Sequence, residues 1–339
     1  MESFADNLIE QIREKKSIIC IGLDPRIGEK NTIPNNILEN AKNKTENESE
    51  ANNIAIWEFN KQIINETHKI TPIYKPQIAF YEKYNALDAL KKTIEHIHNM
   101  GSLAILDAKR NDIGSTSRAY AQTVFDSFNA DAVTVNSYFG IDGVQPFLDY
   151  IPRGKGIILL IKTSNPSSGE FQDLFSVNLP KVSSTITEID IPNNKNKQLR
   201  LTRNYIQMAR LLKNWSENSD IVKVKRAFGK YGYSSLGGVV GATYPEQLSK
   251  IRKEIPKSFI LIPGFGAQGG TPKDIVNGIN EDGLGAIVNS SRGIDFAYQK
   301  AQYAEKFGEA DFAKASYEAA NEMRKEINQT LREEGKTPF

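Results

Sequence analysis

Short apolar segments alternate with longer amphipathic segments along this chain, and the alternation predicts repeated strand–helix units. Eight segments have the length and the apolar composition of strands, at residues 18–24, 73–80, 103–109, 132–136, 157–163, 238–243, 259–264 and 286–290. Several of them are apolar at every position, which is typical of parallel strands that are covered on both faces. The pattern therefore predicts an α/β fold with a parallel sheet.

Stretches with a helical spacing of apolar residues lie between the strands, for example at 54–68, 86–98, 115–128 and 244–254. Eight such units favour a (β/α)8 TIM barrel, whose active site is built at the carboxyl ends of the strands. An open, doubly wound sheet shows the same alternation, so counting the units does not exclude it.

Two segments break the alternation. Residues 27–53 are rich in Asn, Glu and Lys, and we expect an irregular, solvated excursion there. Residues 164–236 are far longer than one loop and one helix, so we expect a long irregular insertion after strand 5, at about 164–200, and then a helix at 201–215. We expect residues 1–339 to form one barrel domain, with the insertion over the active site.

Composition narrows the possible partners. The chain has 339 residues, with 43 Lys and Arg against 41 Asp and Glu, and a formal net charge of +2. This balance gives no reason to expect nucleic acid or an acidic membrane surface as a partner. The first residues lack the pattern of a signal peptide, and no apolar run approaches the ~20 residues of a membrane span, so we expect a cytoplasmic protein.

Residues that bind metals or form disulfides are few. The single cysteine, Cys20, lies in an apolar run and is expected to be a buried strand residue, because it cannot form an intrachain disulfide. The histidines, His68, His96 and His98, lie in polar helical stretches without metal-like partners. Since no group of His, Asp and Glu has the spacing of metal ligands, we expect no metal.

Charged residues mark the end of the third predicted strand, where Asp107 and Lys109 are followed by Asp112. Residues two apart on a strand point to the same face, so Asp107 and Lys109 would both reach the barrel mouth. If two carboxylates and one ammonium were buried together, the protonation of each group would depend strongly on the charges of the others. The alternative is a helix N-terminus, in which Asp112 and Ser115 cap backbone amides while Lys109 forms a surface pair.

The two preceding strands also end in polar or charged residues. Lys75 and Gln77 would share one face of the second strand, and Asp24 follows the first. Catalytic residues in barrels come from the ends of several strands. Three successive strands of this kind therefore favour an active site over isolated caps and surface pairs.

A glycine-rich segment at 263–270 follows the seventh strand and contains the G-x-G-x-x-G pattern of dinucleotide sites. That interpretation is weak, because Pro272 follows at once and the next strand offers no acidic residue to a ribose. We interpret the segment as a backbone site for one phosphate, completed by Arg292 and its neighbours after the eighth strand. The alternative is two glycine-rich turns and a surface arginine.

The segment Asp107-x-Lys109-x-x-Asp112-Ile113 resembles the D-x-K-x-x-D-I signature of orotidine 5′-monophosphate decarboxylases, in the longer subclass of many prokaryotes and some parasites. Further blocks agree in the same order, at residues 22–26, 75–80, 131–136, 162–166, 239–245, 263–270 and 291–292. Two positions depart from the family: Ser137 stands where proline is expected, and Asn111 takes a place often held by glycine.

The resemblance implies a cofactor-free decarboxylase that converts orotidine 5′-monophosphate to uridine 5′-monophosphate, the last step of de novo pyrimidine nucleotide synthesis. It implies that Lys109 protonates C6 as carbon dioxide leaves, while Asp107 lies beside the substrate carboxylate. It also implies a homodimer with shared active sites, in which Asp112 completes the charge network of the neighbouring subunit and Lys75 joins that network.

Substrate contacts are implied in the same way. The residues concerned are Asp24, Gln77, Ile113, Thr116, Thr163, Ser164, Gln268, Arg292 and Gly293. Asp24 and Lys75 would bind the ribose, Thr116 would reach the ribose of the partner, and Ser164 would contact the pyrimidine edge. Arg292, with Gln268 and Gly293, would hold the phosphate.

Two alternative functions are a sister enzyme of the same barrel suprafamily and a protein of another class. A metal-dependent sugar-phosphate decarboxylase or aldolase of the same barrel suprafamily shares D-x-K-x-x-D, but the blocks at 22–26, 75–77 and 162–166 argue against it. A non-catalytic phosphate-binding barrel should have lost one of its four charged catalytic positions, and none is missing.

Overall fold

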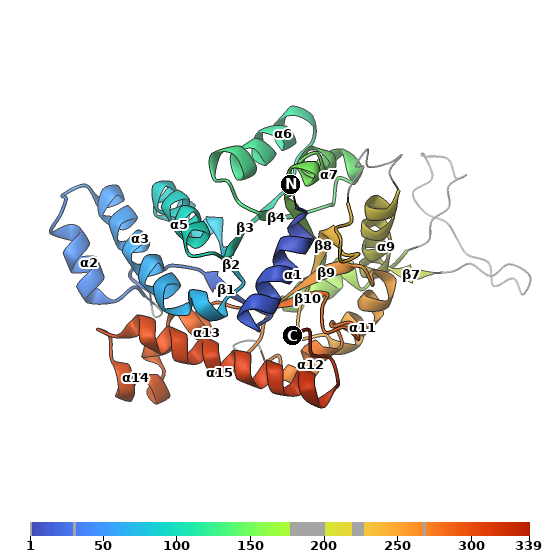
Figure 1. Cartoon of the computed structure of the whole chain (residues 1–339). Coiled ribbons are helices and arrows are strands. Elements are labelled where there is room, and N and C mark those ends of the chain that lie inside the picture. The colour runs from blue at the N-terminus through green and yellow to red at the C-terminus, as the bar shows by residue number, and fades with distance from the viewer. Residues whose placement is uncertain (1, 30–31, 177–200, 219–226, 267–268) are drawn as a thin grey trace, which may run out of the picture.

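The computed structural model describes residues 2–29, 32–176, 201–218, 227–266 and 269–339. Within these residues, eight parallel strands form a closed barrel (Figure 1). In barrel order they are β1 (Ile19–Leu23), β10 (Ala286–Ser290), β9 (Ser258–Pro263), β8 (Ser234–Val240), β5 (Gly156–Lys162), β4 (Ala132–Val135), β3 (Leu103–Arg110) and β2 (Ile73–Pro76). Because β1 pairs with both β2 and β10, the sheet has no open edge, and the predicted (β/α)8 barrel is confirmed.

Helices surround the barrel and separate its strands (Figure 1). The α-helices are α1 (Phe4–Lys15), α2 (Asn35–Lys42), α3 (Glu48–Thr67), α4 (Ile78–Lys83), α5 (Leu87–Asn99), α6 (Gly114–Gln122), α7 (Ile141–Leu148), α8 (Gly169–Gln172), α9 (Asn204–Glu217), α11 (Pro245–Glu254), α12 (Pro272–Val276), α13 (Arg292–Asp295), α14 (Ala301–Phe307) and α15 (Phe312–Glu333). Shorter turns are η1 (His68–Ile70), η2 (Thr123–Ser127), η3 (Ile151–Arg153), η4 (Pro166–Ser168) and η5 (Ala297–Gln299). None of the described helices is both long enough and apolar enough to cross a bilayer.

Local sequence explains where several elements begin. Ser3 and Asn47 precede α1 and α3, and each side chain accepts a hydrogen bond from an amide in the first turn of its helix. Thr271 and Asp274 form a reciprocal capping box at the start of α12. The strands β1, β4, β8 and β10 are buried along their whole length, including Cys20 on β1, as their apolar composition predicts.

The segment 27–53 is not the irregular excursion that its polar composition predicted. It contains α2 and the first residues of α3, and these two helices pack against each other. Ile37 and Ala41 are buried four residues apart in α2, a helical spacing that the surrounding Asn, Glu and Lys obscured.

Some element boundaries also differ from the predicted ones. The second strand ends at Pro76 instead of residue 80, because the chain turns at once into α4. The sixth barrel strand is Ser234–Val240 rather than 238–243.

The insertion after strand 5 is described only at its two ends. The short strands β6 (Phe175–Ser176) and β7 (Thr202–Arg203) form a two-stranded antiparallel sheet, and β7 leads directly into α9. The rest of the predicted irregular insertion, residues 177–200, lies outside the described residues.

Candidate active site

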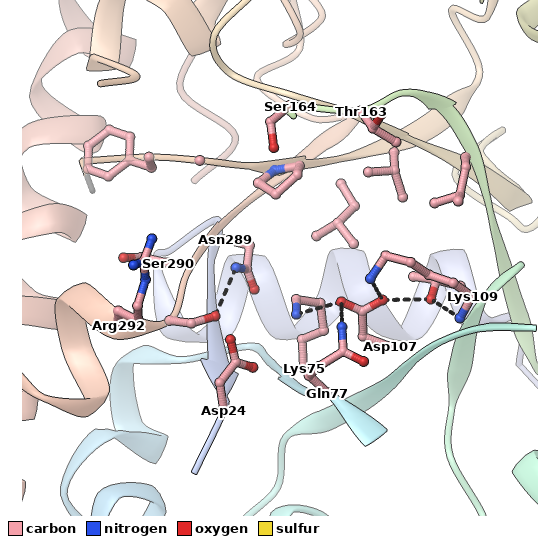
Figure 2. A pocket seen from close by; sticks show the side chains of 18 of the residues that line it. Asp24, Lys75, Gln77, Asp107, Lys109, Thr163, Ser164, Asn289, Ser290 and Arg292 are labelled. Atoms are coloured by element: carbon pink, nitrogen blue, oxygen red, sulfur yellow. Dashed lines mark hydrogen bonds and ion pairs between the residues drawn. The ribbon is translucent and has the colours of Figure 1, made fainter. Parts of the chain in front are cut away.

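A cavity of about 260 Å³ opens at the carboxyl ends of the barrel strands. The polar and charged residues that line it are Asp24, Lys75, Gln77, Asp107, Lys109, Thr134, Thr163, Ser164, Asn289, Ser290, Ser291 and Arg292. Figure 2 shows Lys75, Gln77, Asp107 and Lys109 as one group, with Arg292 at the other end of the cavity. The structure thus brings together most of the site residues that the sequence suggested.

Asp107 is the centre of the charged group, although its exposure is only 6%. Its Oδ1 accepts hydrogen bonds from Lys109 Nζ at 2.6 Å and from Thr134 Oγ1 at 2.8 Å. Its Oδ2 accepts from Lys75 Nζ at 2.9 Å and from Gln77 Nε2 at 3.0 Å (Figure 2). Four donors therefore fix both oxygens of one buried carboxylate.

The charges of this group support one another. Burial on its own would raise the pKa of Asp107, but Lys75 and Lys109 outweigh it and hold the pKa far below its ordinary value. Burial likewise opposes the charge of Lys75, and the carboxylates of Asp107 and Asp24 together raise its pKa above the ordinary value. Asp107 is thus a carboxylate and Lys75 an ammonium at neutral pH.

The backbone at Lys109 is unusual, and it explains how Lys109 reaches Asp107. Lys109 has φ 47°, in the left-handed region, and the pairing of β3 with β4 shifts register between Leu106 and Arg110. The regular strand alternation assumed from the sequence therefore does not apply at this point. The side chain of Lys109 is 44% exposed, so its ammonium stands at the border of the cavity.

Thr134 on β4 holds this irregular backbone, and sequence reasoning did not single it out. Its hydroxyl accepts the Lys109 backbone N–H at 3.0 Å and donates to Asp107 at 2.8 Å. One signal was present in the sequence: Thr134 is the only polar residue in the strand Ala132–Val135.

The opposite wall of the cavity carries Thr163 and Ser164, directly after β5 (Figure 2). The buried Lys162 anchors this wall, because its Nζ donates to Ser168 Oγ at 2.9 Å and lies 3.0 Å from Asp173 Oδ2. Gly241 lets Ser164 lie close to the backbone after β8, because a Cβ at position 241 would lie only 2.8 Å from Ser164 Cβ. Lys162 thus ties β5 to the segment that follows it, and the sequence showed this residue only as part of a longer block.

Arg292 and the loop after β9 form the end of the cavity farthest from Lys109 (Figure 2). Gly264 has φ 99°, a conformation that favours glycine, and lets the loop turn back over the cavity. Gly293 follows Arg292 in α13 but does not line the cavity. Gln268, the other expected phosphate ligand, lies outside the described residues.

Three further expected site residues do not line the cavity. Asp112, Ile113 and Thr116 follow β3, and none of them lines the cavity. The Asp112 carboxylate accepts the Ile113 N–H at 2.8 Å, and Ile113 is 56% exposed. Helix α6 has no side-chain cap, and Lys109 pairs with a buried acid, so the alternative of a capped helix with a surface ion pair is wrong.

Comparison with known proteins gives one consistent result. The model of the family described as "Orotidine 5'-phosphate decarboxylase / HUMPS family" matches residues 17–307. The chain is 37% identical over 326 residues to the orotidine 5′-phosphate decarboxylase of Clostridium novyi, covering 95% of this chain and 97% of that protein. Identity to the protein of the same name from Petrotoga mobilis is 38% over 326 residues, with 95% and 97% covered. The structure of Leishmania donovani OMP decarboxylase superimposes with a TM-score of 0.67 at 29% identity, covering 97% and 98% of the two chains.

The contacts of Thr134 generate a first prediction. Thr134→Val keeps the shape of the side chain but removes a donor to Asp107 and the acceptor of the Lys109 N–H. We expect the free energy of unfolding to fall by about 1–2 kcal/mol and kcat to fall about tenfold or more. Thr134→Ser, which retains the hydroxyl, is the control and should keep most of the activity. Wild-type kcat in Thr134→Val would show that the hydroxyl is not needed.

Proposed function

The chain belongs to the orotidine 5′-phosphate decarboxylase / HUMPS family and converts orotidine 5′-monophosphate to uridine 5′-monophosphate, and we propose that Lys75, Asp107 and Lys109 form its reacting centre. One observation carries this proposal: two ammonium groups contact one buried carboxylate, at 2.6 Å and 2.9 Å, in the wall of the cavity. The reaction is the last step of de novo pyrimidine nucleotide synthesis. As a cofactor-independent carboxy-lyase, the enzyme must stabilise the developing charge with its own side chains.

The movement of electrons decides the roles at this centre. The bond between C6 and the carboxylate carbon breaks, the electron pair stays on C6, and carbon dioxide leaves. The Lys109 ammonium stabilises that pair and then transfers a proton to C6, which an arginine would not readily do. Asp107 lies beside the substrate carboxylate, and Lys75 keeps Asp107 ionised and in place.

Contacts to the rest of the substrate follow the length of the cavity. Arg292, at the end farthest from Lys109, holds the phosphate, with Gly293 beside it in the chain. Asp24 lies between Arg292 and Lys75 in Figure 2, which suits contact with the ribose together with Lys75. Gln268 as a phosphate ligand rests on the family resemblance alone.

The pyrimidine ring would lie between the charged centre and the wall after β5. Ser164 contacts its edge, and Thr163 and Gln77 complete the polar lining on the two sides. Phosphate binding far from C6 supplies interaction energy that orients the ring over Lys109.

We propose that two copies of the chain share their active sites in a homodimer. Asp112, Ile113 and Thr116 belong to a loop and helix that follow the catalytic strand, yet none lines the cavity of its own chain. In a closed twofold dimer, Asp112 would complete the charge network of the partner, and Thr116 and Ile113 would contact the partner's substrate.

We also propose that residues 1–339 form one domain, because a continuous cluster of buried apolar side chains joins the barrel strands to the helices around them. A cytoplasmic location suits an enzyme whose substrate and product are both phosphorylated nucleotides.

No observation in the described part of the chain favours the two alternative functions. The oxygens of Asp107 are engaged by four donors, and the described residues contain no group of three His, Cys, Asp or Glu that could hold a metal ion. A non-catalytic barrel would have no need of the charges of Lys75 and Lys109 around this acid.

The proposed proton transfer predicts the effect of removing Lys109. Lys109→Ala should lower kcat on the order of a thousandfold or more, because both the proton donor and the nearest positive charge are lost. The loss of ultraviolet absorbance of orotidine 5′-monophosphate measures the rate. Lys314→Ala, which removes an exposed lysine paired with Asp311 at 2.9 Å, should be as active as the wild type. A Lys109→Ala variant with a tenth of the wild-type kcat would contradict the proposed role.

The proposed phosphate contact predicts a dependence on the substrate. Arg292→Ala should lose much of its kcat/KM for the nucleotide and far less for the nucleoside that lacks the phosphate, because only the nucleotide uses the guanidinium. Steady-state kinetics with both substrates checks this. Equal losses for both would mean that Arg292 acts on the structure or elsewhere in the site.

The shared site predicts complementation between two inactive variants. Lys109→Ala and Asp112→Ala homodimers should each be nearly inactive. In a mixed dimer, the Asp112→Ala chain keeps its own Lys109 and receives Asp112 from its partner, so one site of two is native. Random exchange makes about half of the dimers mixed, and about a quarter of wild-type activity should therefore return. Native mass spectrometry shows whether exchange occurs; exchange without recovered activity would place Asp112 in the site of its own chain.

A further inference from the structure

Asp295 is a fully buried acid that the proposed mechanism does not use. It ends the short helix α13, three residues after Arg292, and its exposure is 0%. Its Oδ2 accepts the backbone N–H of Asp24 at 3.1 Å. Its Oδ1 is buried and has no hydrogen-bond partner among the described residues, and the same holds for Oδ1 of Asp24.

Among the described residues, no cation forms a hydrogen bond or ion pair with Asp295. The charged and titratable groups that act on it are Asp24, Arg26, Lys75 and Tyr81. Lys75 contacts Asp107 at 2.9 Å, and Arg26 lies 3.5 Å from Glu29 with its guanidinium 5.0 Å from the centre of the Phe80 ring. Lys300, after η5, donates to the Gly293 carbonyl at 3.0 Å.

An ionised Asp295 would therefore be a buried charge without a partner beside a second negative charge. Burial and the charge of Asp24 raise the pKa of Asp295 well above its ordinary value, although the Asp24 N–H, Lys75 and Arg26 act in the opposite direction. The neutral acid fits the surroundings better. Its carbonyl oxygen accepts the Asp24 N–H, and its hydroxyl adds a donor to a pair of acids in which one buried oxygen of each has no donor.

We propose that Asp295 is a positioning residue: as a neutral acid it holds Asp24 in the orientation in which Asp24 contacts the ribose of the substrate. This rests on the proposed contact between Asp24 and the ribose. It assigns Asp295 no contact with the substrate, since Asp295 does not line the cavity.

The protonation state is tested by the pH dependence of stability, without any measurement of activity. An acid whose pKa is raised on folding stabilises the folded protein fully at low pH. This contribution to the free energy of unfolding is lost as the pH rises above the ordinary pKa of the acid toward its pKa in the folded protein. Asp295→Asn cannot ionise. Its equilibrium constant for folding, relative to the wild type, should rise by up to about tenfold per pH unit between pH 5 and pH 7 in urea unfolding.

A matched variant is Asp126→Asn. Hydrogen bonds from Tyr150 and Arg153 lower the pKa of Asp126, so it is ionised throughout this pH range and its difference from the wild type should be flat. A flat or falling difference for Asp295→Asn would show an ionised Asp295 and would overturn the proposal.

The positioning role is tested by a double-mutant cycle on KM for orotidine 5′-monophosphate. Asp295→Leu leaves the Asp24 N–H without an acceptor and should raise KM about tenfold with little change in kcat. Asp295→Asn keeps an acceptor oxygen, so its KM at pH 7 should stay within about threefold of the wild type. In the Asp24→Ala background, the effect of Asp295→Leu on KM should disappear.

An additive cycle would mean that Asp295 does not act through Asp24, and the proposal would fail. If Asp24→Ala alone leaves KM unchanged, the ribose contact itself is wrong, and the positioning role falls with it. The unfolding measurement is independent of turnover, so it shows separately whether Asp295 is the neutral acid that the proposal requires.

Discussion

Asp107 carries its negative charge in a place that is almost closed to water, and the rest of the active site depends on that charge. A buried carboxylate is costly unless cations and donors surround it. The cations and donors come from β3, β4 and the end of β2, and they are Lys75, Gln77, Lys109 and Thr134. Removing any one of these four side chains would leave the Asp107 carboxylate with one hydrogen bond fewer, so the four depend on one another. The same network that stabilises Asp107 also holds the Lys109 ammonium at the cavity.

The barrel makes this arrangement possible and also separates it from the phosphate end. Parallel strands end on the same rim, so side chains from β2, β3 and β4 converge there. Arg292 follows β10, which is separated from β3 by β1 and β2 in the closed sheet. The distance between the two ends of the cavity is thus set by the positions of the strands in the closed sheet. Binding energy gained at the phosphate end can orient the ring at the other end.

The sequence predicted the contacts that depend only on the spacing of residues along a strand. It did not predict the contacts that depend on an irregular backbone conformation. Lys75 and Gln77 are two residues apart and meet the same oxygen of Asp107, as strand alternation predicts. The left-handed conformation of Lys109 has no signature in a lysine, and the role of Thr134 depends on that conformation. The helix α2 was missed because polar composition was given more weight than the four-residue spacing of its few apolar side chains.

Two buried acids of this site, Asp107 and Asp295, show that burial does not determine protonation by itself. Both are nearly closed to water, and burial raises the pKa of each. Asp107 has two lysines within hydrogen-bonding distance and stays ionised, whereas the largest effect of a charge on the pKa of Asp295 is that of another acid, Asp24. The pKa of the same residue type is thus shifted in opposite directions at these two positions. A site that must bind a substrate with two negatively charged groups benefits from this arrangement, because every further carboxylate kept neutral lowers the repulsion that the substrate meets.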